Sequence, residues 1–200
     1  MLFLDKGRIG KFTSSRISDL MGIKGIGKTG ESYAKTKAIE LFTGSFDEGF
    51  SNLDTARGLE LEPYAFNKAK EIFALELKKV YESRIIQYDS NNASTPDGFI
   101  NEDTVLEIKC PRQGKVLDFI AEGVSALDKN WIDQVQHQMM CSKRDYAVIF
   151  LYCIINGDEV YHYDTINRDD LRIQLMIERV GEAANFRDNY LTRINNNKKF

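Results

Sequence analysis

The feature of this sequence that most restricts its fold is an apolar run over residues 146–155, which reads YAVIFLYCII without a charge. A strand with one face in water alternates apolar and polar residues, whereas a strand covered on both faces is apolar throughout. Asn156-Gly157-Asp158 follows the run, and Asn-Gly is typical of a tight hairpin turn. The sequence therefore predicts a central strand that is covered on both faces and joined through this turn to a second strand over 160–165.

The rest of the chain shows the patterns of helices and short strands. Caps and apolar spacing indicate five helical segments, at 16–21, 32–42, 53–80, 128–140 and 169–193. Pro63 marks a start or a kink in the third of these, because proline removes an internal hydrogen bond. Three β-prone runs, separated by turn residues as in a meander, cover 84–89, 98–101 and 105–110. We expect an α/β fold with a mixed central sheet flanked by helices.

The length of 200 residues is that of one ordinary domain. We expect a single domain over 1–200, with an N-terminal helical part at about 1–80, a sheet core at about 81–166 and a C-terminal helix at about 169–193. The three cysteines form no CxxC pair, which fits a reducing cytoplasm better than a zinc site or a disulfide framework. The N-terminal apolar run is too short for a signal peptide, and no membrane span is expected.

Charge is distributed unevenly along the chain. The net charge of −3 and the pI of about 5.5 argue against binding to nucleic acid, because phosphate contacts need Lys and Arg. Residues 1–40, however, carry eight Lys and Arg against four Asp and Glu. A site for a metal ion also gathers carboxylates, which lowers the pI without preventing contact with DNA. The overall charge therefore does not decide the function.

The segment over 95–111, TPDGFINEDTVLEIKCP, carries the candidate chemistry. Side chains alternate along a strand, so Glu107 and Lys109 project from one face while their neighbours point to the other. Two charged groups on a strand that otherwise resembles core must face each other, a metal ion or a cleft. The preceding strand of a hairpin would return Asp97 to the level of Glu107, within reach of a shared cation.

Two carboxylates and a backbone carbonyl, for which Ile108 is the natural candidate, are hard oxygen ligands of the kind that Mg²⁺ or Mn²⁺ takes. Such a site suits phosphodiester hydrolysis, with Lys109 orienting the attacking water or neutralising the developing charge. The alternative is a surface Glu–Lys pair beside an ordinary Asp-Gly turn, because a bare D-x9-E-x-K pattern often occurs by chance.

Four ordered blocks of the chain resemble the lambda-exonuclease or YqaJ-type viral recombinase family of the PD-(D/E)xK nuclease superfamily. They are RIGKFTSS at 8–15, GLELEPYA at 58–65, the PD and EIKCP core within 96–111, and WIDQVQ at 131–136. The first, second and fourth are similar to the family patterns R-x-G-x-x-T-x-S, G-x-x-x-E-x-x-A and Y-x-x-Q-x-Q. Trp131 departs from the usual Tyr and Thr95 from the usual Ser, and neither belongs to the metal-binding trio.

The resemblance implies a restriction-endonuclease-like fold and a Mg²⁺-dependent deoxyribonuclease. It implies that Arg8 and Ser15 contact a DNA phosphate. It also implies that Glu62 faces the metal site from a helix and helps through a second metal ion or a water, and that Gln134 completes the catalytic set. Further implications are 5′-to-3′ exonuclease digestion of linear double-stranded DNA in phage-type recombination, a trimeric ring, and a single-strand annealing partner in the cytoplasm of a bacterial host.

Other functions stay open. An endonuclease or a repair nuclease of the same fold would share the site, and a non-catalytic DNA-binding module is a further possibility. Gly22–Thr29 matches the phosphate-loop pattern of an NTPase, G-x4-G-K-T, which requires a buried strand before the loop. The preceding SSRISDLM is more typical of a helix, which favours a loop whose Lys24 or Lys28 contacts DNA phosphates.

The helix expected over 128–140 carries a face formed by Trp131, Gln134 and Gln138. This face either turns toward the site or lies in solvent as an ordinary polar surface. His137 on the same helix is expected to be structural, because the chain has too few histidines for a metal centre or an acid–base pair.

Overall fold

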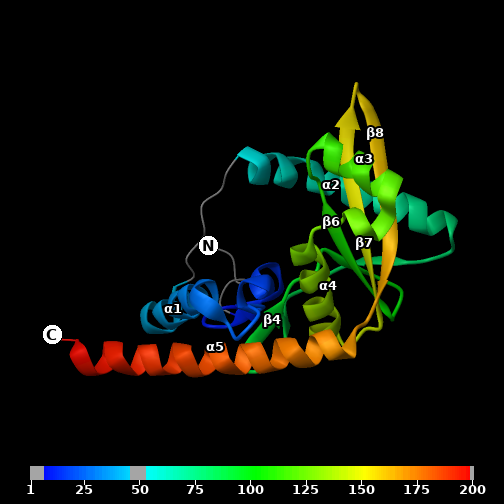
Figure 1. Cartoon of the computed structure of the whole chain (residues 1–200). Coiled ribbons are helices and arrows are strands. Elements are labelled where there is room, and N and C mark those ends of the chain that lie inside the picture. The colour runs from blue at the N-terminus through cyan, green and yellow to red at the C-terminus, as the bar shows by residue number, and fades with distance from the viewer. Residues whose placement is uncertain (1–6, 46–52, 199–200) are drawn as a thin grey trace.

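The computed structural model describes residues 7–45 and 53–198 (Figure 1). Its main sheet has five strands in the order β2-β5-β6-β7-β8. Their bounds are Val80–Glu82 (β2), Gly98–Ile100 (β5), Thr104–Lys109 (β6), Tyr146–Ile155 (β7) and Asp158–Asn167 (β8). β6 and β7 are parallel and the other neighbours are antiparallel, which confirms the predicted mixed sheet. Residues 1–6, where we expect no signal peptide, lie outside the described residues.

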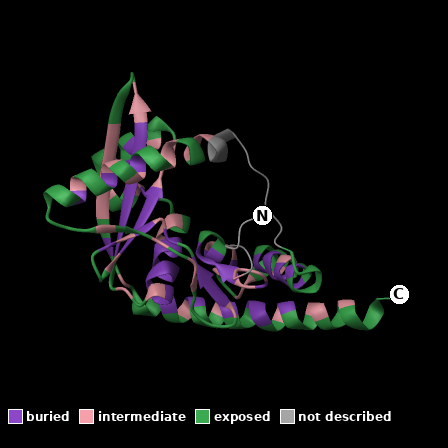
Figure 2. Cartoon of the chain, turned by 180° about the vertical axis from the view of Figure 1, so that it is seen from behind, coloured by how far each residue is buried: buried purple, intermediate pink, exposed green. Residues whose placement is uncertain are grey.

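The apolar run forms β7 over its whole predicted length. Residues 147–153 are all buried, and Figure 2 shows the buried colour concentrated on the central strands. The turn into β8 has Asn156 at φ 54° and Gly157 at φ 93°, the left-handed geometry that an Asn-Gly hairpin turn requires. β8 is longer than the predicted 160–165 at both ends.

Alternate side chains of β6 and β7 point to opposite sides of the sheet, so both of its faces carry apolar residues. Helices cover both faces (Figure 1). The cluster under α2 (Leu53–Leu75) is formed mainly by Ala65, Ala69, Phe73, Leu106, Ile108, Val148 and Phe150. The cluster under α3 (Gln113–Glu122) and α4 (Lys129–Ser142) includes Val105, Val116, Phe119, Val135, Met139, Ile149 and Leu151. Each large apolar side chain buried in this way contributes about 1.5–3 kcal/mol to the stability of the fold.

A second group of elements lies beside the main sheet. It comprises β1 (Phe12–Thr13), the 3-10 helix η1 (Ser14–Leu20), α1 (Gly27–Thr43), β3 (Ile86–Gln87), β4 (Asn92–Ser94) and α5 (Asp170–Asn197). The three strands pair in the order β1-β4-β3, α1 lies along the long α5, and η1 packs against α4 (Figure 1). A short 3-10 helix, η2 (Gly123–Ala126), follows α3. No described helix has the length and apolarity to cross a membrane.

One of the three strands predicted for the meander does not belong to the main sheet. Only Ile86–Gln87 of the run over 84–89 forms a strand, and it pairs with β4 in the small sheet. The partner of β5 is instead β2. Strands of two or three residues are too short for alternation to reveal them, and their pairing is decided by tertiary contacts.

Helix boundaries also differ from the prediction. α2 continues through Pro63 instead of starting there, and the segment expected as a helix over 16–21 is the 3-10 helix η1. α1 begins at Gly27 rather than near residue 32, so the end of the glycine-rich stretch is helical. The sequence does not predict α3, because this helix is short and contains Gly114, which lowers helix propensity.

A buried histidine joins three elements of the fold. His137 of α4 is fully buried, and its Nδ1 lies 2.8 Å from the Ser14 hydroxyl of η1. Its Nε2 lies 2.9 Å from the Asn92 side-chain oxygen of β4. Burial lowers the pKa of His137 to about 4, although the charge of Asp89 acts in the opposite direction. His137 therefore holds α4 to η1 and β4 as a neutral side chain, the structural role expected for it.

We predict that this histidine makes the fold sensitive to acid. Because its pKa is lowered in the folded chain, its stabilising contribution is complete above the unfolded pKa near 6.5 and is lost as the pH falls toward 4. The free energy of unfolding should fall by about 1.4 kcal/mol per pH unit in this window. Urea denaturation at several pH values measures the slope. His137→Gln should flatten it, whereas His162→Gln should not, and equal slopes for His137→Gln and the unmodified chain would contradict the prediction.

Candidate active site

The β5–β6 hairpin brings the two predicted acidic residues together. Gly98 pairs with Leu106, and the same register continued by one residue sets Asp97 opposite Glu107. A side chain at position 98 is excluded by space, because a Cβ there would lie 2.8 Å from the Tyr81 carbonyl oxygen and 3.0 Å from the Phe66 ring. The glycine thus lets α2 and β2 approach the start of β5 closely, where Asp97 stands.

Asp97 takes the place of a missing strand partner. β5 begins only at Gly98, so the part of β6 beyond Leu106 has no neighbour on that side of the ladder. The Ile108 backbone N–H donates instead to Asp97 Oδ2 at 2.6 Å. This bond fixes the Asp97 side chain at the end of the strand and keeps the Ile108 amide satisfied.

Glu107 accepts hydrogen bonds from several side chains on the face of β6 that α4 covers. It is 3% exposed, and its Oε1 accepts from Lys109 Nζ at 2.7 Å and from Gln134 Nε2 at 2.5 Å. Gln138 Nε2 donates to its second oxygen, Oε2, at 2.6 Å. Lys109 Nζ also donates to Gln134 Oε1 at 3.0 Å. Each donor satisfies part of a buried carboxylate, which is costly to leave unpaired.

The face of α4 formed by Trp131, Gln134 and Gln138 therefore points into the site. The sequence indicates Gln138 only as a member of that face and does not predict its direct bond to Glu107. The signal that could have found it is the four-residue spacing from Gln134, which stacks two amides one helical turn apart. Ser142 Oγ donates to the Gln138 backbone carbonyl at 2.7 Å, one turn further along α4.

Burial and the repulsion between carboxylates shift pKa values at this site. Burial and then the charge of Glu107 raise the pKa of Asp97 well above its usual value, although the bond from Ile108 acts in the opposite direction. Burial and Glu107 also raise the pKa of Glu62 on α2. Burial alone would lower the pKa of Lys109, but the surrounding carboxylates, Glu107 foremost, raise it. The site thus concentrates negative charge around one partly buried ammonium group.

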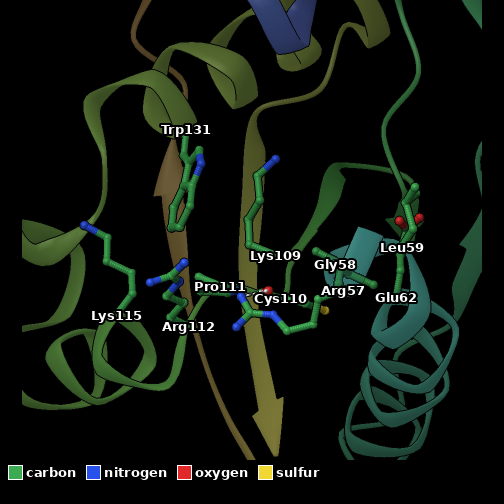
Figure 3. Close-up of a pocket in the computed structure, with 11 residues that line it drawn as sticks. Arg57, Gly58, Leu59, Glu62, Lys109, Cys110, Pro111, Arg112, Lys115 and Trp131 are labelled. Atoms are coloured by element: carbon green, nitrogen blue, oxygen red, sulfur yellow. Dashed lines mark hydrogen bonds between the residues drawn. The ribbon is translucent and has the colours of Figure 1, made fainter. Parts of the chain in front are cut away.

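A cavity of about 660 Å³ opens beside these residues (Figure 3). Glu62, Ile108 and Lys109 form part of its wall, and Trp131 lines it from α4. A smaller cavity of about 320 Å³ is lined by Asp97 and Glu62 together with residues of α2 and β2. Glu62 therefore lies on both cavities and Asp97 on the second, so solvent and ligands can reach these two carboxylates.

The donor set suits a hard divalent cation. Glu107 is buried and Asp97 partly buried, the two carboxylates repel each other, and a cation between them would relieve this repulsion. Among the described residues no three His, Cys, Asp or Glu side chains are close enough to hold a metal ion by themselves. The two carboxylates would thus need a backbone oxygen such as that of Ile108, with water and substrate in the other positions.

Two predicted phosphate-binding residues lie on the N-terminal elements, and no described contact joins them to Glu107. Arg8 is half-buried, and its charge helps to lower the pKa of Lys37 on α1, where burial is the main cause. Ser15 is exposed on η1, the helix that packs against α4. The roles of Arg8 and Ser15 stay predictions.

The glycine-rich stretch over 22–29 lacks the surroundings of a phosphate loop. The described residues before it form η1 rather than a strand. The Glu182 carboxylate accepts the Ile26 N–H at 3.2 Å at the start of α1, where a nucleotide phosphate would need to bind. This arrangement disfavours an NTPase.

The chain matches a known protein family over most of its length. Residues 5–145 match the model of the YqaJ-like viral recombinase domain. The chain belongs to this family. The resemblance read from the four blocks is thereby confirmed, although no curated protein matches the sequence.

Solved structures resemble this YqaJ-like chain over nearly its whole length. The alkaline exonuclease of Laribacter hongkongensis superposes with a TM-score of 0.81 at 26% identity, covering 94% of this chain and 93% of that one. The same enzyme in complex with dAMP gives 0.81 at 25% identity, with 96% and 95% covered. A phage-related exonuclease from Haemophilus somnus 129PT shares the fold, with a TM-score of 0.72 at 17% identity and 92% and 96% covered. The fold is therefore the restriction-endonuclease-like PD-(D/E)xK fold that the sequence predicts.

We predict that Asp97→Asn stabilises the YqaJ-like chain when divalent ions are removed. Because the Asp97 pKa is raised on folding, ionisation lowers stability as the pH rises through the unfolded pKa near 3.9, and the loss stays above the folded pKa. Asparagine keeps an acceptor for the Ile108 N–H without the charge. The Tm in EDTA at pH 8 should rise by about 2–4 °C for each kcal/mol of repulsion removed.

The control for this variant is Asp118→Asn, a substitution at an exposed acid of α3. Thermal unfolding followed by circular dichroism compares the two variants with the unmodified chain. A lower Tm for Asp97→Asn than for Asp118→Asn at pH 8 would show that the carboxylate is not under repulsion.

Proposed function

We propose that the chain is a metal-dependent exonuclease that hydrolyses phosphodiester bonds of linear double-stranded DNA. The observation that carries the proposal is the meeting of Asp97, Glu107 and Lys109 at the open end of β6, beside a cavity. The Laribacter hongkongensis relative, which this chain matches over more than nine-tenths of both lengths, is an alkaline exonuclease. One of its structures holds dAMP, a mononucleotide of the kind that exonuclease digestion of DNA releases.

In this proposal Mg²⁺ or Mn²⁺ is held by Asp97, Glu107 and the Ile108 carbonyl, with Glu62 acting through water or a second ion. When bound, such an ion stabilises charge on the phosphate and lowers the pKa of a bound water. Asp97 is already fixed by the Ile108 N–H, and Glu107 by the two α4 amides. Little side-chain freedom then remains to be lost when the ion binds, which favours binding.

Lys109 and Gln134 act on the water and the phosphate. The Lys109 ammonium lies on the cavity wall and keeps its positive charge at neutral pH, since the nearby carboxylates raise its pKa. It can therefore orient the attacking water or neutralise charge on the phosphate oxygens. Gln134 bonds both Lys109 and Glu107, so it holds the ammonium and the carboxylate at a fixed separation.

The finer properties come from the family resemblance. We propose 5′-to-3′ digestion, with Arg8 and Ser15 holding a DNA phosphate on the N-terminal elements. We further propose a trimeric ring and a single-strand annealing partner in phage-type recombination, within the cytoplasm of a bacterial host. A ring would bring several copies of the basic N-terminal segment to one DNA molecule, which would help an acidic protein to hold it.

Substitution of the central residues should abolish the activity. Glu107→Ala removes a carboxylate and Lys109→Ala an ammonium, and loss of one such group lowers the rate by roughly 100- to 1,000-fold or more. Release of acid-soluble nucleotides from 5′-phosphorylated linear duplex measures the effect. Glu102→Ala and Lys79→Ala, at exposed positions, should keep full activity with the same Tm. Full activity of either central variant would refute the assignment.

The topology of the substrate separates an exonuclease from an endonuclease of the same fold. We expect linear duplex to be digested and a covalently closed circle of the same sequence to stay intact, because a circle offers no end. EDTA should stop digestion, and added Mg²⁺ or Mn²⁺ should restore it. A time course on agarose gels shows both results. Cleavage of the circle at the rate of the linear form would instead establish an endonuclease.

A further inference from the structure

The larger cavity has a composition unlike the rest of the chain. Of the described residues that line it, four are cationic (Arg57, Lys109, Arg112 and Lys115) and one is acidic (Glu62). The whole protein, in contrast, has a net charge of −3. The volume of about 660 Å³ lies within the roughly 300–1,000 Å³ typical of small-molecule sites. This concentration of positive charge beside Glu62 and Lys109 favours an anionic ligand.

The same cavity contains the only tryptophan of the 200 residues. Trp131 stands between two lysines: Lys109 Nζ is 5.9 Å and Lys115 Nζ 5.7 Å from the centre of its ring (Figure 3). Part of the side chain packs against the core cluster of α3 and α4, so the indole is held firmly while it also lines the cavity. An anchored aromatic ring next to cations is a surface on which a nucleobase can stack while its phosphate is neutralised.

The cations at the Trp131 end of the cavity come from the segment that follows β6. Arg112 precedes α3 and Lys115 lies in its first turn, close to the exposed Asp128, with which Lys115 forms a 2.7 Å ion pair. The Asp128 side chain is half exposed, so this pair is weak and a phosphate oxygen can replace the carboxylate. On the opposite wall Arg57 Nη2 donates to the Cys110 carbonyl at 3.3 Å.

We propose that this cavity binds the nucleotide next to the cleaved bond, with its base stacked on Trp131 and its phosphate near Lys115 and Arg112. The inference rests on the proposed function, because Lys109 and Glu62 on the same wall place the cavity beside the reacting phosphate. It assigns Trp131 and Lys115 to the recognition of DNA. Stacking is tolerant of sequence, since every base presents an aromatic face, and so suits a nuclease that digests any sequence.

The test removes the base and the ring separately. Duplexes with 5′-phosphates are prepared intact, with two abasic nucleotides at the 5′ end of one strand, or with two at its 3′ end. Binding to the full chain in EDTA, where cleavage is blocked, is followed by quenching of Trp131 fluorescence and, for all variants, by anisotropy of a labelled duplex. Single-turnover digestion of the same duplexes in Mg²⁺ is measured in parallel.

For the unmodified chain, one abasic duplex should bind roughly 10- to 100-fold more weakly than the intact duplex. Trp131→Ala should weaken binding to the intact duplex by a similar factor but add little on that abasic duplex, because base and ring act as one contact. Trp131→Phe should retain most of the affinity. The proposal would be overturned if Trp131→Ala and base removal weakened binding by independent factors that multiply on both abasic duplexes. It would also be overturned if Trp131→Ala did not change the affinity for the intact duplex.

Salt dependence tests the phosphate contact. Lys115→Ala should reduce the slope of log affinity against log salt by about one, whereas Lys79→Ala, at an exposed position outside the cavity, should leave it unchanged. An unchanged slope for Lys115→Ala would remove Lys115 from the site. Binding is measured without cleavage, so the two proposals can fail separately. Stacking of the base without digestion of DNA would support the nucleotide site and contradict the proposed nuclease activity. Digestion of DNA with independent effects of ring and base would support the nuclease activity and contradict the nucleotide site.

Discussion

The pairing of a buried glutamate, Glu107, with a partly buried aspartate, Asp97, at the open end of β6 is the constraint on which the rest of this structure depends. The strand register sets Asp97 opposite Glu107, and burial together with the charge of Glu107 raises the pKa of Asp97. The surrounding chain donates hydrogen bonds to both carboxylates: a backbone N–H binds Asp97, and an ammonium and two side-chain amides bind Glu107. These donors hold the carboxylates in place, and the remaining excess of negative charge favours a divalent cation.

The architecture follows from the need to bring those donors to one strand end. β6 is parallel to β7, so the chain must cross over between them, and the crossover supplies α3 and α4. α4 thereby lies over the face from which Glu107 projects, while α2 covers the opposite face and reaches the site with Glu62. The long apolar β7 anchors both layers. The acidic residues thus sit where a short strand ends within a rigid sheet.

The sequence predicted the parts that long, regular patterns describe. The run over 146–155 became β7 at the predicted bounds, and strand alternation placed Glu107 and Lys109 on one face. It missed β2 and β4 because strands of three residues carry too little pattern, and it missed α3 because a short helix with a glycine resembles a loop. Gln138 was ambiguous for another reason: whether a polar helical face is buried depends on the strand it meets, which local spacing cannot reveal.

The place of α4 gives the fold an additional property. His137 ties this helix to Ser14 of η1 and Asn92 of β4, and its neighbour in sequence, Gln138, holds Glu107. A displacement of the segment around Arg8 and Ser15 would therefore also shift α4, the helix that holds Glu107. In the proposed function, a DNA phosphate held at Ser15 would therefore act on the alignment of Glu107 through α4.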